Sequence, residues 1–328
     1  MSDVLELHDL IPADRTLRGV DDIPVLLHLG PHKTGSTWLQ KRFFPGVDNI
    51  VHSPDIGLTH RAFLQPRFGE FSIARAISIL DPLLQEARRT GRPLVLSDEA
   101  LGGRAFGQKY YREIVALRLR QVFPAARLLV LSRRQETIFP SIYGEYLRYG
   151  HASPLEAFMA GDSGNALVQP IVDDTYYEWD RVLAFYREVF GERSVLMVPM
   201  EAVVGDAPAM AATLGEFLNR PLQCRHDAEM RAPERPALSV WAMATLRLAN
   251  RFVPQDSRAR SRLKRLSPNS LAWQVDRITP RGVRARTAAV QLAFVRDRLG
   301  DRFALSNLRY AQMTGHDLAP LGYRLPQP

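Results

Sequence analysis

The chain has 328 residues and a net charge of +8, with 46% hydrophobic and 24% charged residues, a composition typical of a soluble globular protein. No apolar run approaches the roughly 20 residues needed to cross a bilayer, and the polar first 22 residues do not resemble a signal peptide. Cys224 is the only cysteine, which excludes an intrachain disulfide and a cysteine-based zinc site, so we expect a cytoplasmic protein.

Short apolar runs alternate with longer helical patterns up to Pro221, which predicts an α/β fold with a parallel sheet flanked by helices. The apolar runs do not alternate with polar residues, so we expect strands covered on both faces at 24–29, 93–98, 127–132 and 194–199. Helical patterns occupy 36–44, 72–90, 108–123 and 174–190. The region 151–172 has no strong period and is predicted to be a mobile loop over a site.

After Pro221 the strand patterns stop. Amphipathic helices are predicted at 237–252 and 283–299, separated by a Pro/Ser/Arg-rich stretch at 254–282. We divide the chain into an N-terminal segment (1–22), an α/β core (23–221) and a helical C-terminal extension packed on the core (222–328).

The positive charge is concentrated in this extension. From 231 to 302 there are 16 Lys/Arg against 5 Asp/Glu. This asymmetry indicates either an arginine-rich solvated helix surface or an anionic partner, such as a membrane surface, an acidic polymer or an anionic cofactor. Nucleic acid is not expected as a partner, because no nucleic-acid-binding module or interleaved aromatic pattern accompanies the arginines.

A glycine-rich loop, GPHKTGST (30–37), follows the first predicted strand and opens a helix. Gly30 and Gly35 keep the spacing of a P-loop, G-x-x-x-x-G-K-[ST], but Ser36 stands at the lysine position and Lys33 lies inside the loop. Backbone N–H groups at the start of a helix favour a phosphate, and Lys33 would add a point charge beside it. The alternative is a chance match to a glycine-rich turn.

The stretch HKTGSTWL (32–39) resembles the first signature of sulfotransferases that use 3′-phosphoadenosine 5′-phosphosulfate (PAPS). That signature is P-K-[ST]-G-[ST]-[ST]-[WS]-L after a strand, and only the proline is replaced here, by His32. The resemblance implies that Lys33 contacts the transferring sulfuryl group. It also implies a cofactor-binding set in this motif that comprises Lys33, Thr34, Gly35, Ser36, Thr37 and Trp38. PAPS has no β/γ-phosphate pair, so a lysine after the second glycine would have nothing to reach, and no metal is required.

A second signature of the same family, which binds the 3′-phosphate, is a strand followed by Arg and, eight positions later, by Ser at the start of a helix. Arg133 and Ser141 have this spacing. A planar guanidinium and a hydroxyl suit phosphate oxygens. Arg134 is an alternative to Arg133, because the family usually has Asp or Asn and then Pro after the arginine. Weaker similarity at 176–222 and 302–323 extends the resemblance over most of the chain, and Arg231 and Arg235 resemble a late basic segment.

The general base implied by the carbohydrate-modifying branch of the family is a Glu after a central strand, and Glu99 in PLVLSDEAL matches it. We expect the neighbouring Asp98 to raise the pKa of Glu99 by like charge. The alternative role of Glu99 is to begin the next segment. His28 and His32 are competing bases, His28 being the more typical of an interior side chain, whereas His52, His60 and His151 are interpreted as surface or loop residues.

The sequence therefore predicts an enzyme that moves a sulfuryl group from PAPS to a hydroxyl, or an amine, of a carbohydrate or glycolipid acceptor. Residues 58–72 and 151–172 would shape the acceptor pocket, with Arg104, Tyr143 and Arg148 as candidate contacts. A kinase or NTPase with a degenerate P-loop is one alternative, although Ser36 in place of lysine argues against it. A catalytically inactive nucleotide-binding module is the other. The sequence indicates no oligomeric state.

Overall fold

The computed structural model describes residues 19–67, 69–106, 111–160, 171–225, 238–252 and 267–327. One parallel sheet has the strand order β2-β3-β1-β4-β5. The strands are β1 (Val25–His28), β2 (Val51–His52), β3 (Leu94–Ser97), β4 (Arg127–Ser132) and β5 (Val195–Pro199).

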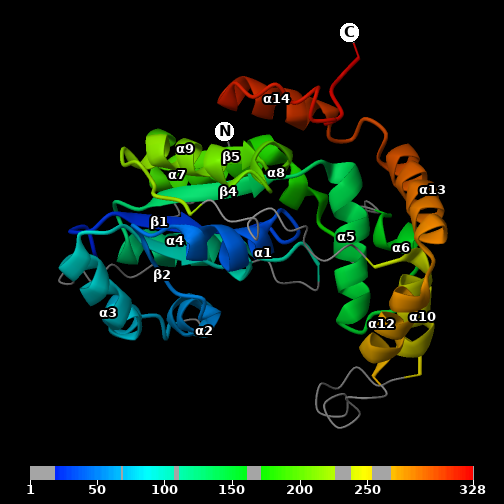
Figure 1. The fold of residues 1–328 in the computed structure, drawn as a ribbon, viewed down its shortest axis with the longest axis horizontal. Helices are drawn as coiled ribbons and strands as arrows, with labels where there is room; N and C mark the ends of the chain where they lie inside the picture. The colour runs from blue at the N-terminus through cyan, green and yellow to red at the C-terminus, as the bar shows by residue number, and fades with distance from the viewer. Residues whose placement is uncertain are drawn as a thin grey trace.

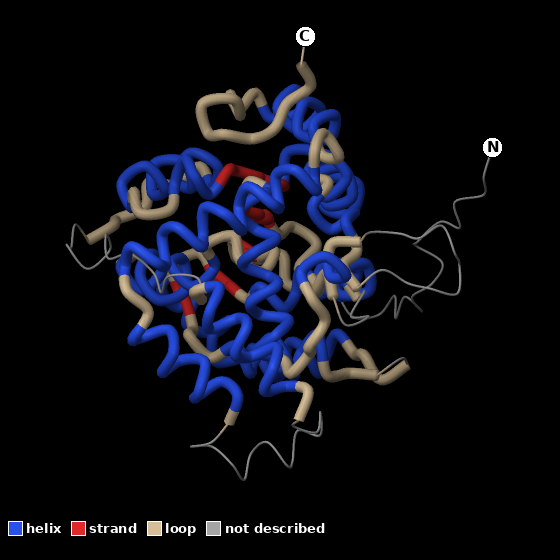
Figure 2. The backbone as a smooth tube through the Cα atoms, turned by 90° about the vertical axis from the view of Figure 1, so that its right-hand side faces the viewer, coloured by secondary structure: helices blue, strands red, loops and turns tan. Residues whose placement is uncertain are grey.

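Helices lie on both faces of this sheet and along its edges, and the strands run through the interior of the molecule (Figures 1 and 2). The α-helices are α1 (Ser36–Trp38), α2 (Ile56–Thr59), α3 (Ile73–Thr90), α4 (Arg112–Val122), α5 (Gln135–Arg148), α6 (Leu155–Phe158), α7 (Trp179–Phe190), α8 (Met200–Val203), α9 (Ala207–Leu218), α10 (Val240–Asn250), α12 (Pro268–Ile278), α13 (Arg281–Leu299) and α14 (Ala304–Thr314). The shorter turns are π at Leu39–Phe43 (η2) and His60–Leu64 (η4), and 3₁₀ at Phe44–Gly46 (η3), Glu99–Gly102 (η5), Asp174–Tyr177 (η6) and Glu192–Ser194 (η7).

Successive residues of each strand point to opposite faces, and both faces are buried. In β4, Leu128 and Val130 pack with α3, α4 and α7, whereas Leu129 and Leu131 pack with α9 and the helix that follows the glycine-rich loop. This double burial explains the continuous apolar runs in the sequence. The four predicted strands and their parallel arrangement are confirmed. The two-residue β2 was not predicted.

The strand order brings three chain segments to one edge of the sheet. Because β3, β1 and β4 are neighbours and parallel, their carboxyl ends lie side by side. The segments that leave these ends are the glycine-rich loop after β1, the turn that begins at Asp98 after β3, and the pair Arg133 and Arg134 after β4. Ligands of open parallel sheets bind at such an edge.

The C-terminal helices pack against α5 and α7. The hairpin of α10 and α12 lies beyond α5 from the sheet, together with α13, whereas α14 contacts α7 (Figure 1). The predicted helices at 237–252 and 283–299 correspond to α10 and α13. The stretch 254–282 was predicted to be a linker between two helices, yet it contains α12. This helix begins after Ser267, which caps it, and has Pro268 at its first helical position. No helix in the described segments is long and apolar enough to cross a membrane.

The residues after α14 return to the end of β4. Ser132 Oγ lies 3.0 Å from the hydroxyl of Tyr310 and 3.1 Å from that of Tyr323. The Tyr323 hydroxyl also donates to Glu201 Oε2 at 3.1 Å. All four side chains are at most partly exposed. The C-terminal segment thus completes the hydrogen bonding beside Arg133 and Arg134.

Candidate functional site

The glycine-rich loop after β1 folds back on itself through left-handed backbone conformations. Gly35 has a φ of 98° and Lys33 a φ of 68°. A Cβ added at Gly35 would lie 2.7 Å from Val204 Cγ2, and one added at Gly30 would lie 2.9 Å from the Glu99 Cα. Both glycines therefore allow a close approach that a larger residue would prevent. The loop lies in contact with the turn that carries Glu99.

The side chains of the loop differ in their orientation. Thr34 is buried and donates to the Pro31 carbonyl at 2.6 Å, so its hydroxyl closes the loop. Ser36 Oγ is also buried and has no hydrogen-bond partner among the described residues. Thr37 is exposed.

Trp38 was predicted to bind the cofactor, and its side chain is buried in the core. The ring is 1% exposed and stacks on Phe43, with the ring centroids 5.5 Å apart. Both rings belong to the core on one face of the sheet. The indole is therefore a core side chain, and the Trp38 backbone N–H donates to the Gly35 carbonyl of the loop.

Arg133 connects the second predicted motif to the first. Its Nη1 donates to the carbonyl of Lys33 at 2.7 Å, and its Nε donates to Thr137 Oγ1 at 3.0 Å. Ser141, predicted at the start of a helix, lies instead in the middle of α5, which begins six residues earlier at Gln135. Thr137 and Ser141 are four residues apart in α5, so both lie on one face of the helix.

Glu145 continues this face of α5 by one more turn. Its Oε2 lies 2.9 Å from Lys33 Nζ, and its Oε1 lies 3.8 Å from His32 Nδ1. The carboxylate is mostly buried. Sequence reasoning missed this residue, although a spacing of four from Ser141 on a predicted helix would have identified it as a neighbour of the loop.

Arg134 points away from the loop. Its backbone N–H donates to Glu201 Oε1 at 3.0 Å, and its guanidinium lies 3.5 Å from Glu201 and 3.7 Å from Glu136. The two arginines that the sequence left as alternatives are thus distinguished by their partners. Arg133 lies on the loop, whereas Arg134 is paired with acids.

Glu99 begins the 3₁₀ turn η5 and accepts a hydrogen bond from Gln40 Nε2 at 2.8 Å. Burial tends to raise the pKa of Glu99, but the His32 and His28 rings and the bond from Gln40 together outweigh it, so the pKa lies below its ordinary value. The expectation that Asp98 would raise this pKa was wrong.

Asp98 is instead the carboxyl whose pKa is raised. Burial is the main cause, and the charge of Glu99 adds to it. The Asp98 side chain accepts from Thr59 Oγ1 at 2.6 Å and from the Ala100 N–H at 2.9 Å, and His60 Nε2 lies 3.2 Å away. Burial raises the pKa of both carboxyls, but the groups around Glu99 outweigh this effect and those around Asp98 do not, so Asp98 is the member of the pair that ionises less readily.

The histidines near the loop have defined environments. His28 is fully buried, its Nδ1 lies 2.8 Å from Ser97 Oγ, and burial lowers its pKa to about 4. Burial also lowers the pKa of His32, and that of His52 to about 4. His52 lies in β2 and contacts Phe44, so it is not the surface or loop residue that was expected. His151 lies in a loop, as expected, and stacks on Tyr146 with the ring centroids 4.2 Å apart.

Arg104, Tyr143 and Arg148, the residues predicted to contact the acceptor, differ in their partners and their exposure. The Arg104 guanidinium lies 4.3 Å from the centroid of the Tyr149 ring and donates to its hydroxyl at 2.8 Å. Tyr143 donates to the Ser153 carbonyl at 3.0 Å, and Arg148 is exposed at the end of α5. Arg231, Arg235 and residues 161–170 of the predicted mobile loop lie outside the described residues.

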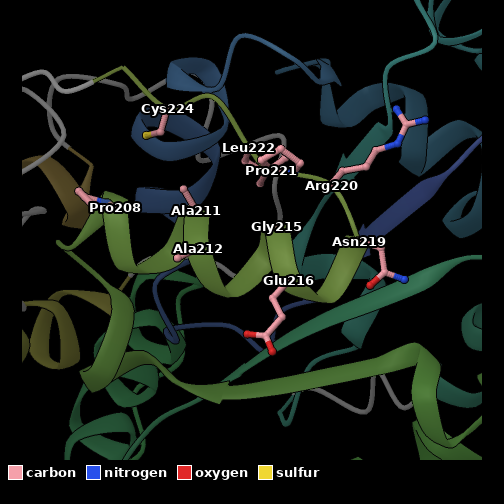
Figure 3. A pocket seen from close by; sticks show the side chains of 10 residues that line it. All are labelled: Pro208, Ala211, Ala212, Gly215, Glu216, Asn219, Arg220, Pro221, Leu222 and Cys224. Atoms are coloured by element: carbon pink, nitrogen blue, oxygen red, sulfur yellow. The ribbon is translucent and has the colours of Figure 1, made fainter.

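A groove of about 620 Å³ lies elsewhere, between α9 and the segment that follows it (Figure 3). Its lining includes Ala211, Gly215, Leu222 and Cys224, and none of the predicted site residues. In the described part of the chain, no group of three or more His, Cys, Asp or Glu side chains is arranged to hold a metal ion.

Comparison with solved structures identifies proteins of similar fold. A sulfotransferase from Alicyclobacillus acidocaldarius matches 90% of this chain and 98% of its own, with a TM-score of 0.52 and 13% sequence identity. The mouse sulfotransferase SULT7A1 complexed with PAP matches 71% of this chain and 68% of its own, with a TM-score of 0.34 and 13% identity. No protein-family model and no curated protein matches the sequence. The chain therefore has an α/β fold, with a parallel sheet flanked by helices, that is similar to the fold of the A. acidocaldarius sulfotransferase.

Proposed function

We propose that this protein is a sulfotransferase with PAPS as the sulfuryl donor. The proposal depends on one observation above all, the contact between Arg133 and the carbonyl of Lys33. Two motifs 100 residues apart, each of which resembles a part of the PAPS-binding signature, come together at the same edge of the sheet. Among the described residues, Arg133 makes no ion pair, although burial lowers its pKa. A buried guanidinium that has no ion pair within the described chain favours the binding of an anionic ligand.

The side chains around the loop suit a nucleotide with separate phosphate groups. Ser36 Oγ is a buried hydroxyl with no hydrogen-bond partner in the described chain, and the Lys33 side chain, paired with Glu145, is partly exposed in the same loop. The glycines leave room for backbone N–H groups to approach a phosphate closely. Cations at both Lys33 and Arg133 match the two ends of a 3′,5′-bisphosphate better than the linear chain of a triphosphate.

Bound PAPS supplies the sulfuryl group that is transferred. The chain's own residues position it and stabilise charge: Lys33 at the loop, Gly35, Ser36 and Thr37 at the 5′-phosphate, and Arg133 with Ser141 at the 3′-phosphate. Fixed cations and N–H donors stabilise negative charge on the transferring group and the leaving phosphate without reorganising during the reaction. Glu145 holds Lys33 in place before the nucleotide binds.

Glu99 is the proposed general base. Its lowered pKa keeps the carboxylate ionised at neutral pH, which a base requires before it accepts the proton of the acceptor hydroxyl. Its backbone lies beside Gly30 of the loop, so the carboxylate and the loop lysine belong to one site. The proposed acceptor is a hydroxyl, or an amine, of a carbohydrate or glycolipid. Glu145 is the second carboxylate near Lys33, but its pairing with the lysine favours a positioning role.

Calorimetric titration tests the donor. We expect 3′,5′-adenosine bisphosphate (PAP) to bind, AMP to bind much more weakly, and ATP with Mg²⁺ not to compete. A preference for ATP with Mg²⁺ would overturn the proposal in favour of a kinase or NTPase. Turnover of PAPS with a panel of sugar acceptors then separates an enzyme from an inactive module that binds the nucleotide.

A further inference from the structure

The hairpin of α10 and α12 carries an unusual concentration of exposed apolar side chains. Six of the eleven large hydrophobic residues that are exposed in the described chain lie on this hairpin or at its end. We call the surface of the hairpin that carries these six, which extends around both sides of α12, the hairpin face: Trp241, Leu248, Phe252, Leu271, Trp273 and Ile278. The side chains of Phe252 and Ile278 are 80% and 79% exposed, so they contribute little to the stability of the fold. A concentration of exposed apolar side chains on one part of a protein is typical of a surface that binds another molecule.

The hairpin is attached to the rest of the molecule by its other side. Met243 and Leu246 of α10 are buried in the main core, and Asn250 Nδ2 donates to the Leu147 carbonyl at 2.7 Å. The two helices are antiparallel, because Ser239 at the start of α10 donates to Asp276 near the end of α12 at 2.7 Å. The hairpin is thus a fixed part of the fold, at an edge of the molecule (Figure 1).

The charges around the hairpin face are almost all positive. The described residues 238–252 and 267–299 contain eight arginines and two aspartates. Arg284 is paired with Asp276, and Arg296 is paired with Glu136 of α5. Arg277 lies 4.8 Å from the centroid of the Trp273 ring, which places a cation and an aromatic ring of the same helix together. The surface combines aromatic and aliphatic groups with a surplus of guanidinium groups.

We propose that the hairpin face docks on the surface of an anionic lipid bilayer. Tryptophan, phenylalanine and leucine partition into the boundary between headgroups and acyl chains, and arginines beside them attract anionic headgroups. An acidic polymer would engage the arginines but leave the six apolar side chains in water. A second copy of this chain would bring two strongly positive surfaces together. The lipid surface is the partner that matches both properties.

Vesicle co-sedimentation of the full chain tests this inference. We expect the protein to pellet with phosphatidylcholine vesicles that contain phosphatidylglycerol, and to pellet much less with phosphatidylcholine alone or in high salt. Phe252→Ser with Ile278→Ser should weaken vesicle binding about tenfold or more, because two apolar groups no longer leave water. Both positions are exposed, so the variant keeps the fold. Leu305→Ser on α14 and Ile114→Ser on α4 are controls at apolar positions that are about half exposed and lie outside the hairpin, and they should bind as the parent does.

Tryptophan fluorescence gives a second readout. Trp38 and Trp179 are buried, whereas Trp241 and Trp273 are about half exposed. Brominated lipids should therefore quench the emission of the parent, and Trp241→Phe with Trp273→Phe should lose the quenched component.

Three results would overturn the inference. The first is no binding to anionic vesicles. The second is binding that the Phe252 and Ile278 substitutions leave unchanged and that dextran sulfate abolishes, which indicates a polymer site. The third is a dimer in solution that these substitutions dissociate. None of these measurements needs catalytic activity, so the inference fails or stands independently of the proposed sulfotransferase function.

Discussion

Replacement of Arg133 by alanine is the sharpest test of how the nucleotide is recognised. The guanidinium has five N–H donors. Two of them are used within the protein, one from Nε to Thr137 and one from Nη1 to the Lys33 carbonyl. Three donors remain for a 3′-phosphate. Arg133→Ala should therefore remove the preference for nucleotides that carry this phosphate, and AMP binding should change little.

The expected magnitude follows from these remaining donors. A hydrogen bond to a charged group contributes about 1.5–3 kcal/mol. One such bond, in a partly solvated site, gives an expected loss of about 2 kcal/mol. That corresponds to a loss of affinity for PAP of roughly 30-fold, and two bonds would give a larger loss. A loss of twofold or less is too small for a direct contact.

Calorimetry with PAP and AMP on both proteins closes a thermodynamic cycle, so the 3′-phosphate and the arginine are removed separately and together. Arg134→Ala is the matched control, because Arg134 has the same side chain but is paired with Glu201 and Glu136. The reasoning is refuted if Arg133→Ala keeps the full preference for PAP over AMP. If Arg134→Ala loses that preference instead, the cation at the 3′-phosphate has been assigned to the wrong arginine.

Three further predictions concern the carboxylates and the buried histidine. Glu99→Gln should lower turnover by about 10²–10⁴-fold and change PAP affinity by less than about threefold, because a base acts on the acceptor; an unchanged rate in a PAPS turnover assay would exclude this base. Glu145→Gln removes the carboxylate that lies 2.9 Å from Lys33 and is proposed to position it, so PAP should bind more weakly, by about 0.5–1 kcal/mol, in calorimetry; tighter binding would show that Glu145 competes with the nucleotide for the lysine and does not position it. For His28 the folded pKa of about 4 lies below the unfolded value of 6.5, so the unfolded chain takes up a proton first as the pH falls. Stability should fall by about 2 kcal/mol between pH 7 and 5 from this group, and urea unfolding of His28→Asn should lack that part of the pH dependence.

Much of the sheet could be predicted because burial on both faces leaves a simple pattern. Four continuous apolar runs became four parallel strands, whereas Val51 and His52 of β2 are too few to form a pattern. Helix α12 was missed because the stretch 254–282 around it is rich in proline, serine and arginine and so resembles a linker in composition. Only the cap at Ser267 and Pro268 marks its start.

The candidate site was less predictable, because the spacing of residues within a motif does not show which distant segments of the chain will be in contact. The sequence placed Lys33 and Arg133 in two motifs, but only the fold shows the contact between them. The relation between Asp98 and Glu99 was reversed, since His32, His28 and Gln40, which lie near Glu99 only in the folded chain, lower the pKa of Glu99 and leave Asp98 as the carboxyl that ionises less readily. Trp38 adjoins the glycine-rich loop in sequence, yet helical geometry turns its ring into the core.

The tyrosine pair at the end of β4 has a consequence for the order in which the protein becomes competent during synthesis. Ser132 and Glu201, next to the two arginines, depend on hydroxyls of Tyr310 and Tyr323, which are translated more than a hundred residues later. A nascent chain that ends before Tyr310 has its strands and its loop but lacks these partners. Ribosome-bound chains stalled at increasing lengths should therefore gain affinity for nucleotide late and abruptly, when Tyr323 can reach Glu201, and not when β5 is complete.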